Sequence, residues 1–135
     1  MLGAAHDDYS GGAPREKLQQ ANQRCLLMLQ IETEVGLENV EQIAAVPGVD
    51  CLSIGFMDLS NFLGVPGELT HSIYLAAVER IVLAAKKHRR VLSILAPTEA
   101  LAKEYVARGF QLIFFGSDVA LLQSALAQRI QAVRT

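Results

Sequence analysis

Four short apolar runs recur along the chain, and each is followed by a segment with the apolar spacing of a helix. The runs cover residues 25–33, 49–55, 91–96 and 110–116. Consecutive apolar residues are typical of strands that are covered on both faces, as in parallel sheets. Strands that alternate with helices predict a parallel sheet with right-handed crossovers. The sequence therefore predicts an α/β fold built from four parallel βα units.

The segments between the runs supply the expected helices. Helices are expected at residues 15–24, 33–46, 73–87, 99–108 and 119–133. Residues 1–14 have no periodicity and are expected to form an irregular lead-in to one domain over 15–135. Residues 58–70 are rich in Asn, Gly and Pro and are expected to form an irregular loop above the sheet.

The length of the chain limits the kind of sheet that it can form. Its 135 residues are enough for one ordinary domain. A (β/α)₈ barrel needs about twice as many units and at least about 200 residues. The four units therefore correspond to half of such a barrel. A small doubly wound binding module, such as a flavodoxin-like domain, is the alternative fold, although no Gly-x-Gly-x-x-Gly motif follows the first run.

Two carboxylates stand at the ends of neighbouring predicted strands. Glu32 closes the first run and Asp58 follows the second. Since the carboxyl ends of parallel strands share one edge of a sheet, a divalent cation between two such acids is plausible. Each acid has an alternative role as a helix cap or a surface residue. Gln30 lies on the same side of its strand as Glu32, and it either orients a ligand or is satisfied by the backbone.

Charge and composition exclude several classes of partner. A net charge of −2 and a pI near 5.9 leave no basic footprint for nucleic acid or anionic lipid. No apolar stretch approaches the ~20 residues of a membrane helix, and the first residues do not resemble a signal peptide. Cys25 and Cys51 are expected to be free thiols that behave as small apolar residues. The expected location is therefore the cytoplasm.

Several short motifs occur together in one order along the chain. They are QIET at 30–33, GL at 36–37, GVD at 48–50, IG at 54–55, DLS at 58–60, LG at 63–64, GF at 109–110, GSDV at 116–119 and LL at 121–122. This set resembles the HpcH/HpaI aldolase family from about residue 18 to about residue 126. The family contains metal-dependent (class II) pyruvate aldolases of TIM-barrel fold that act on 4-hydroxy-2-oxo acids, including 2-dehydro-3-deoxyglucarate.

The resemblance implies a role for each candidate site residue. Glu32 and Asp58 correspond to the two carboxylates that bind a divalent metal such as Mg²⁺, Mn²⁺ or Co²⁺. Gln30 matches the glutamine beside bound pyruvate, and the backbone amides of Met57 and Asp58 would receive the pyruvate carboxylate. Leu95 matches an apolar residue of the aldehyde pocket. In the family, the metal holds the 2-oxo acid and stabilises the enolate formed when the aldol bond breaks.

The chain departs from the family pattern in two ways. The family usually has Gly-Pro-x-Asp-Leu where this chain has GFMDL at 55–59, so a rigid turn is replaced by a bulkier one. The family's catalytic histidine and substrate-binding arginine lie on earlier strands, and none of the four runs carries either group. The resemblance therefore covers only the C-terminal half of the barrel.

The remaining histidines and arginines are expected outside the site. His6 lies in the lead-in, His71 in a loop where a solvated or capping role is expected, and His88 at a helix end. Arg89 and Arg90 precede the third run and are expected to face solvent at the opposite end of the sheet. No catalytic residue is therefore identified in this chain.

Two functions remain open. The first is a carbon–carbon lyase that cleaves 4-hydroxy-2-oxo acids to pyruvate and an aldehyde, as a homo-oligomer or with a complementing N-terminal half. The second is an inactive half-barrel that binds a metal and a 2-oxo acid or serves as an oligomerisation module. Residues 119–133 have an apolar face suited to a neighbouring subunit.

Overall fold

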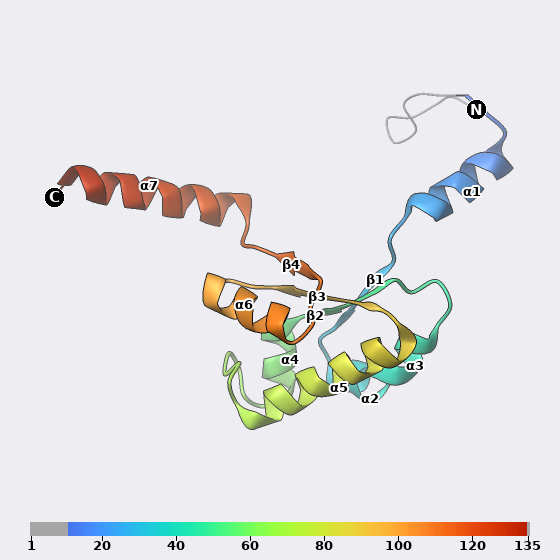
Figure 1. Cartoon of the computed structure of the whole chain (residues 1–135), viewed down its shortest axis with the longest axis horizontal. Helices are drawn as coiled ribbons and strands as arrows, with labels where there is room; N and C mark the ends of the chain where they lie inside the picture. Colours follow the sequence, from blue (N-terminus) through green and yellow to red (C-terminus); the bar gives the residue numbers. More distant parts are fainter. Residues whose placement is uncertain (1–10, 135) are drawn as a thin grey trace.

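The computed structural model describes residues 11–134, in which four strands form one parallel sheet in the order β1-β2-β3-β4 (Figure 1). The strands are β1 Met28–Ile31, β2 Cys51–Ile54, β3 Val91–Leu95 and β4 Leu112–Phe114. The helices are α1 Pro14–Arg24, α2 Glu34–Glu38, α3 Val40–Ala45, α4 Phe56–Phe62, α5 Ser72–His88, α6 Glu99–Ala107 and α7 Asp118–Arg134. The predicted α/β class with four parallel strands is confirmed.

The strand register divides the side chains of the sheet between two faces. One row of aligned residues crosses all four strands and consists of Ile31, Ile54, Ile94 and Ile113. A second aligned row, one residue earlier, consists of Gln30, Ser53, Ser93 and Leu112. Since successive side chains of a strand point to opposite faces, the isoleucine row and the serine-containing row lie on opposite faces.

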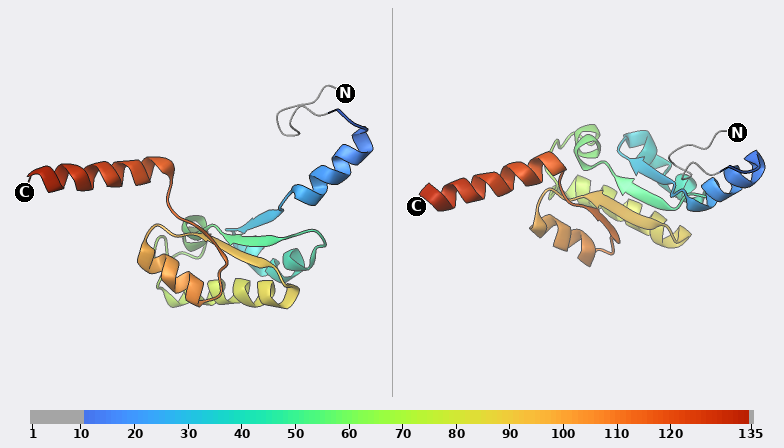
Figure 2. Two further views of the ribbon diagram at one scale, coloured as in Figure 1. Left: turned by 45° about the horizontal axis from the view of Figure 1, so that its top comes forward. Right: turned by 90° about the horizontal axis from the view of Figure 1, so that it is seen from above.

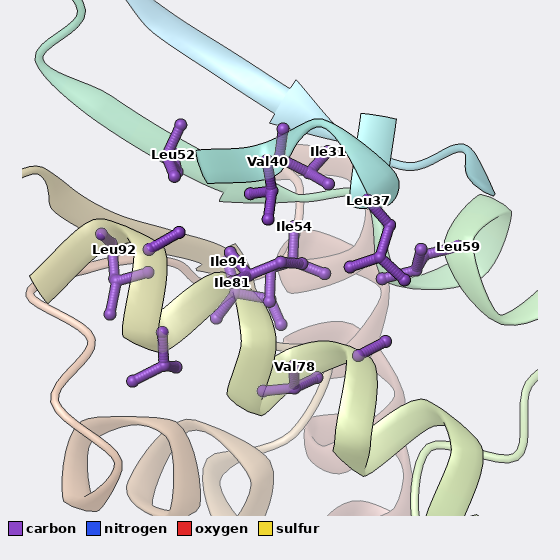
Figure 3. Close-up of a cluster of buried hydrophobic side chains, with 14 of the residues drawn as sticks. Ile31, Leu37, Val40, Leu52, Ile54, Leu59, Val78, Ile81, Leu92 and Ile94 are labelled. Atoms are coloured by element: carbon purple, nitrogen blue, oxygen red, sulfur yellow. The ribbon is translucent and has the colours of Figure 1, made fainter. Parts of the chain in front are cut away.

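One face of the sheet is covered by helices. The helices α2, α3, α5 and α6 lie on the same side of the sheet (Figures 1 and 2). The longest of them, α5, buries seven side chains: Tyr74, Ala77, Val78, Ile81, Val82, Ala84 and Ala85. Figure 3 shows Val78 and Ile81 of α5 facing Ile54 and Ile94 of the sheet. The core therefore lies between the isoleucine face and this helical layer.

The first and last helices do not pack on the sheet. Both α1 and α7 project away from it (Figures 1 and 2), and neither contains a buried residue. The exposed apolar side chains of α7 are Val119, Leu121, Leu122, Leu126, Ile130 and Val133. No helix of residues 11–134 is both long and apolar enough to cross a membrane. One face of the sheet is therefore covered by helices and the other by none of them, as in half of a barrel, although Cys51, Ser53 and Ser93 on that second face are buried.

Some expected elements differ from the observed ones. The segment expected to be a loop after the second strand begins with the helix α4, because Leu59 and Ser60 are fully buried and hold it against the body of the chain. The first strand is shorter than expected and pairs only with β2; two of its four residues are exposed, and Ile31 is buried. Cys25 is therefore exposed, whereas Cys51 is buried, and both thiols are free. His6 lies outside the described residues.

A pair of buried tyrosines joins two of the covering helices. The hydroxyls of Tyr74 in α5 and Tyr105 in α6 lie 3.0 Å apart, and both side chains are buried. Replacing Tyr74 with Phe leaves the Tyr105 hydroxyl without this partner, and the free energy of unfolding is expected to fall by about 1–3 kcal/mol in urea denaturation. The double variant with Tyr105→Phe should lose less than the sum of the two single losses. A fully additive double variant would show that the two hydroxyls do not depend on each other.

The same pair predicts how stability changes at high pH. Burial raises the pKa of both Tyr74 and Tyr105, so the folded chain keeps these protons to higher pH than the unfolded chain. Stability should therefore decrease as the pH rises above about 10, where unfolded tyrosine begins to ionise.

Candidate functional site

The first candidate residues meet at the carboxyl end of β1. Glu32 directly follows this strand, and its carboxylate accepts a hydrogen bond from the Gln30 side-chain amide. Both side chains lie beside Gly55, which follows β2. The contact is set by the pairing of β1 with β2, in which Ile31 lies opposite Ile54. The structure therefore brings Glu32 and Gln30 together, as strand alternation predicts.

Gly55 is needed for this close approach. Its amide donates to the Ile31 carbonyl at 3.1 Å. A Cβ at this position would lie 2.6 Å from both Cβ and Oε2 of Glu32 and 2.8 Å from Nε2 of Gln30. These distances are shorter than van der Waals contact, so only glycine leaves Glu32 and Gln30 in place.

Met57 and Asp58 lie in the first turn of α4, directly after Gly55. The first backbone bond of this helix joins the Leu59 amide to the Gly55 carbonyl at 2.8 Å. The amides of Met57 and Asp58 precede that bond and have no helical acceptor. Both side chains are exposed, with Met57 at 55%. Asp58 therefore stands at the same end of the sheet as Glu32.

Ser60 connects this turn to the loop that follows α4. Its side chain is fully buried. Its hydroxyl donates to the Met57 carbonyl at 2.8 Å and accepts from the Gly67 amide at 2.9 Å. The Ser60 hydroxyl therefore links the backbone at Met57 to the loop at Gly67.

Leu95 ends β3 at the same edge of the sheet. It lies two residues after Ser93, on the serine-containing face that no described helix covers, and it is 40% exposed. Phe114 of β4 is its partner in the register and is also exposed. Leu95 and Phe114 therefore form an exposed apolar pair at this edge.

The structure places the two candidate metal ligands, Glu32 and Asp58, at one end of the sheet. In residues 11–134, no group of three or more His, Cys, Asp and Glu side chains is arranged to hold a metal. Glu32 and Asp58 are oxygen donors at one open edge, and such donors suit a hard divalent ion that keeps water or substrate in its other positions. The chain therefore offers two candidate ligands and not a closed coordination sphere.

The histidines and arginines occupy other positions. His71 caps α5, since its Nδ1 accepts the Ile73 amide at 3.2 Å. His88 lies at the far end of α5, with Nε2 4.0 Å from a Glu41 carboxylate oxygen. Arg90 does not simply face solvent as expected, because its guanidinium donates to the carbonyls of Ala44 and Val46 at the end of α3. The hydrogen bonds of His71 and Arg90, and the approach of His88 to Glu41, thus involve groups other than Glu32.

Two residues of this site were missed by the sequence reasoning. Gly55 and Ser60 carry no chemistry of their own, yet they position Glu32 and Met57. The signals that could have identified them are a glycine directly after an apolar strand and a serine within a short motif that also contains Asp58.

Replacing Gly55 with Ala tests the close packing at the site. The new methyl group must displace Glu32 or Gln30, so the free energy of unfolding is expected to fall by about 1–3 kcal/mol. The side-chain amide signal of Gln30 in a ¹H–¹⁵N spectrum should shift as its bond to Glu32 is disturbed. Gly11→Ala is the control, because a Cβ there meets nothing within 4 Å. An unshifted Gln30 signal in Gly55→Ala would contradict the packing described here.

Comparison with known proteins assigns the chain to a known family. The family model for HpcH/HpaI aldolase/citrate lyase matches residues 6–125. A hydroxypyruvate/pyruvate aldolase of Paraburkholderia phytofirmans is 41% identical over 124 residues, which are 92% of this chain and 48% of the relative. A 5-keto-4-deoxy-D-glucarate aldolase of Klebsiella pneumoniae is 34% identical over 133 residues, 98% of this chain and 52% of the relative.

Solved structures agree with this match. An HpcH/HpaI aldolase/citrate lyase family protein from Burkholderia cenocepacia superposes with a TM-score of 0.84 at 33% identity, over 98% of this chain and 56% of that one. The HpcH/HpaI aldolase from Desulfitobacterium hafniense gives a TM-score of 0.82 at 29% identity, over 99% of this chain and 52% of that one. The chain spans about half the length of these relatives and shares their TIM-barrel type of fold. It belongs to the HpcH/HpaI aldolase/citrate lyase family.

Proposed function

We propose that this chain forms the metal-binding wall of a class II pyruvate-type aldolase site. The reaction is reversible cleavage of 4-hydroxy-2-oxo acids to pyruvate and an aldehyde. The observation that carries the proposal is the Glu32 carboxylate, held by Gln30 against Gly55 at the carboxyl end of β1. Relatives named as hydroxypyruvate/pyruvate and 5-keto-4-deoxy-D-glucarate aldolases support the same class of reaction.

In this proposal each candidate residue has a stated task, and Asp58 has two. Glu32 and Asp58 hold a divalent ion, with Mg²⁺, Mn²⁺ and Co²⁺ as candidates, since carboxylate oxygens are the donors that hard cations prefer. When bound, such an ion acts as a Lewis acid toward the keto oxygen of the 2-oxo acid. Gln30 orients the Glu32 carboxylate through its side-chain amide. The amides of Met57 and Asp58 receive the substrate carboxylate, and Leu95 limits the space for the aldehyde part.

The proton-transferring groups come from outside the described residues in this proposal. His71 is engaged as a helix cap, and His88 and Arg90 lie beside Glu41 and the end of α3. A complementing N-terminal half or another subunit would therefore supply the base and the arginine. The uncovered face of the sheet and the exposed apolar side chains of α7 are surfaces on which such a partner can pack.

The second candidate function is binding without turnover. It is favoured by one observation, that the two described histidines contact groups other than Glu32: His71 caps α5, and His88 lies beside Glu41. In this case the chain binds a metal and a 2-oxo acid, or acts as an oligomerisation module through α7.

The test separates the two functions by measuring binding and cleavage on the same preparation. Mn²⁺ and pyruvate binding is measured by calorimetry, and pyruvate release from 4-hydroxy-2-oxo acids is measured with and without EDTA. Release that depends on the metal supports the aldolase. Saturable binding without release supports the second function. Absence of both metal binding and release would contradict the aldolase and the metal-binding form of the second function, and would leave only the oligomerisation module.

A further inference from the structure

A hollow lies at the opposite end of the sheet from Glu32. It has a volume of about 400 Å³ and lies where α5 ends, β3 begins and β4 begins. Its polar lining consists of Lys86, Arg89, Arg90 and Gln111, and no acidic side chain takes part. The volume falls in the ~300–1,000 Å³ range of small-molecule sites. The hollow is therefore open to a small ligand of negative charge.

The cations of this hollow differ in how they are engaged. Arg90 is occupied, since its Nε donates to the Ala44 carbonyl at 2.7 Å and its Nη2 to the Val46 carbonyl at 3.0 Å. Lys86 and Arg89 form no ion pair among the described residues. The neighbouring acid Glu41 is paired with Lys87 instead. Two positive charges are therefore left without an acidic partner at the hollow.

The other acid near this end of the sheet is directed elsewhere. Asp50 accepts the Val91 amide through its backbone carbonyl at 2.9 Å. Its carboxylate accepts the Leu27 amide at 2.8 Å, on the side of β1. Asp50 is not part of the lining, so it does not neutralise Lys86 or Arg89 within the hollow.

The backbone conformation at Arg89 is one that glycine usually adopts. Its φ is 55°, and it is the only residue other than glycine with positive φ in residues 11–134. The Arg89 amide donates to the Lys86 carbonyl at 3.2 Å and the Arg90 amide to the Ala85 carbonyl at 2.8 Å. This is the Schellman ending of a helix, in which the left-handed residue is usually glycine. A strained residue held in this way is a reason to look for a function of its side chain.

The same helix ending argues against a purely structural role for the positive charges of Lys86 and Arg89. Cations near a helix C-terminus offset its partial negative charge. The backbone already satisfies the carbonyls of Ala85 and Lys86, and glycine at position 89 would end the helix without strain. Ending α5 does not therefore require an arginine at this position.

We propose that this hollow binds a small phosphate-type oxyanion between Lys86 and Arg89. A guanidinium presents a planar fork of donors that matches phosphate oxygens, and an ammonium adds a compact charge. Gln111 accepts the Leu92 amide through Oε1 at 2.9 Å, and its side-chain nitrogen is left as a further donor. This site is at the opposite end of the sheet from Glu32 and does not depend on the proposed aldolase activity.

The test is a titration of the full chain with inorganic phosphate and pyrophosphate, followed by calorimetry and ¹H–¹⁵N spectra. A sodium chloride titration at matched ionic strength corrects for general screening. Saturable binding is expected, with signal changes at residues 86–92 and 109–111. Absence of saturable binding of either anion overturns the proposal.

Two variants and one control locate the site. Arg89→Gly removes the charge and relieves the backbone, so this variant is expected to fold, and it should bind the anion at least about tenfold more weakly. Lys86→Gln should weaken binding in the same direction. Lys103→Ala, which removes one positive charge from α6, should leave binding unchanged. The proposal is wrong if Arg89→Gly and Lys86→Gln bind as the unchanged chain does, or if Lys103→Ala loses as much affinity as they do.

Discussion

Glu32→Gln is expected to weaken Mn²⁺ binding at least about tenfold, since losing even a hydrogen-bond partner of a metal ligand typically costs about 10–100-fold in metal affinity or activity. The substitution keeps the size of the side chain but removes the charge that attracts the cation. The Gln30 amide that now donates to the Glu32 carboxylate would face a neutral group. Calorimetric titration with Mn²⁺ in the presence of pyruvate measures the change.

A matched control separates metal binding from the general effect of charge. Glu34→Gln removes the same charge two residues later, in the exposed first turn of α2. It should leave the affinity unchanged, whereas Asp58→Asn should weaken binding as Glu32→Gln does. Equal losses of Mn²⁺ affinity in Glu32→Gln and Glu34→Gln would show that the effect comes from the net charge of the chain. Glu32 would then no longer be a proposed ligand.

Leu59→Ala is expected to lower the free energy of unfolding by about 2–5 kcal/mol, the usual cost of a cavity in a well-packed core. The Leu59 side chain is fully buried and fixes the first two turns of α4 against the body of the chain. Urea denaturation followed by circular dichroism measures the loss. Because Asp58 precedes Leu59 directly, Mn²⁺ affinity should also fall under conditions in which the variant remains folded.

The control for this change uses the same substitution on an exposed position. Leu83 in α5 is 59% exposed, so Leu83→Ala should change the stability by no more than about 0.5 kcal/mol. If Leu83→Ala costs as much as Leu59→Ala, the surface around Leu83 is buried in an assembly. If Leu59→Ala costs nothing, α4 is not held by the packing of Leu59.

The strands of the sheet could be predicted because each is recognised from the residues within it. β2 and β3 are short, mostly apolar runs, each interrupted by one serine. The helix α6 has standard signals at both ends: the Thr98 hydroxyl accepts the Leu101 amide, and Gly109 follows with positive φ. The helix α4 could not be predicted in this way. Its seven residues contain polar side chains typical of turns, and tertiary burial of Leu59 and Ser60 holds it.

Part of the candidate site could also be predicted from the sequence, and part could not. Gln30 and Glu32 share one side of β1, and alternation along a single strand is enough to predict this. The role of Gly55 depends on the distance between two strands, which no pattern within either strand contains. Arg89 was expected to face solvent, and only the backbone φ of 55° reveals that it holds a position where glycine is usual.

The open edges of the sheet also limit how a partner can complete it. Both β1 and β4 have one unpaired side, and every pairing within the sheet is parallel. A strand that continues this pattern beside β1 or β4 must run in the same direction, and its final residue would then arrive at the end of the sheet where Glu32 stands. The direction of a joining strand thus selects which of its side chains can reach the proposed site beside Glu32, before any side-chain recognition takes place.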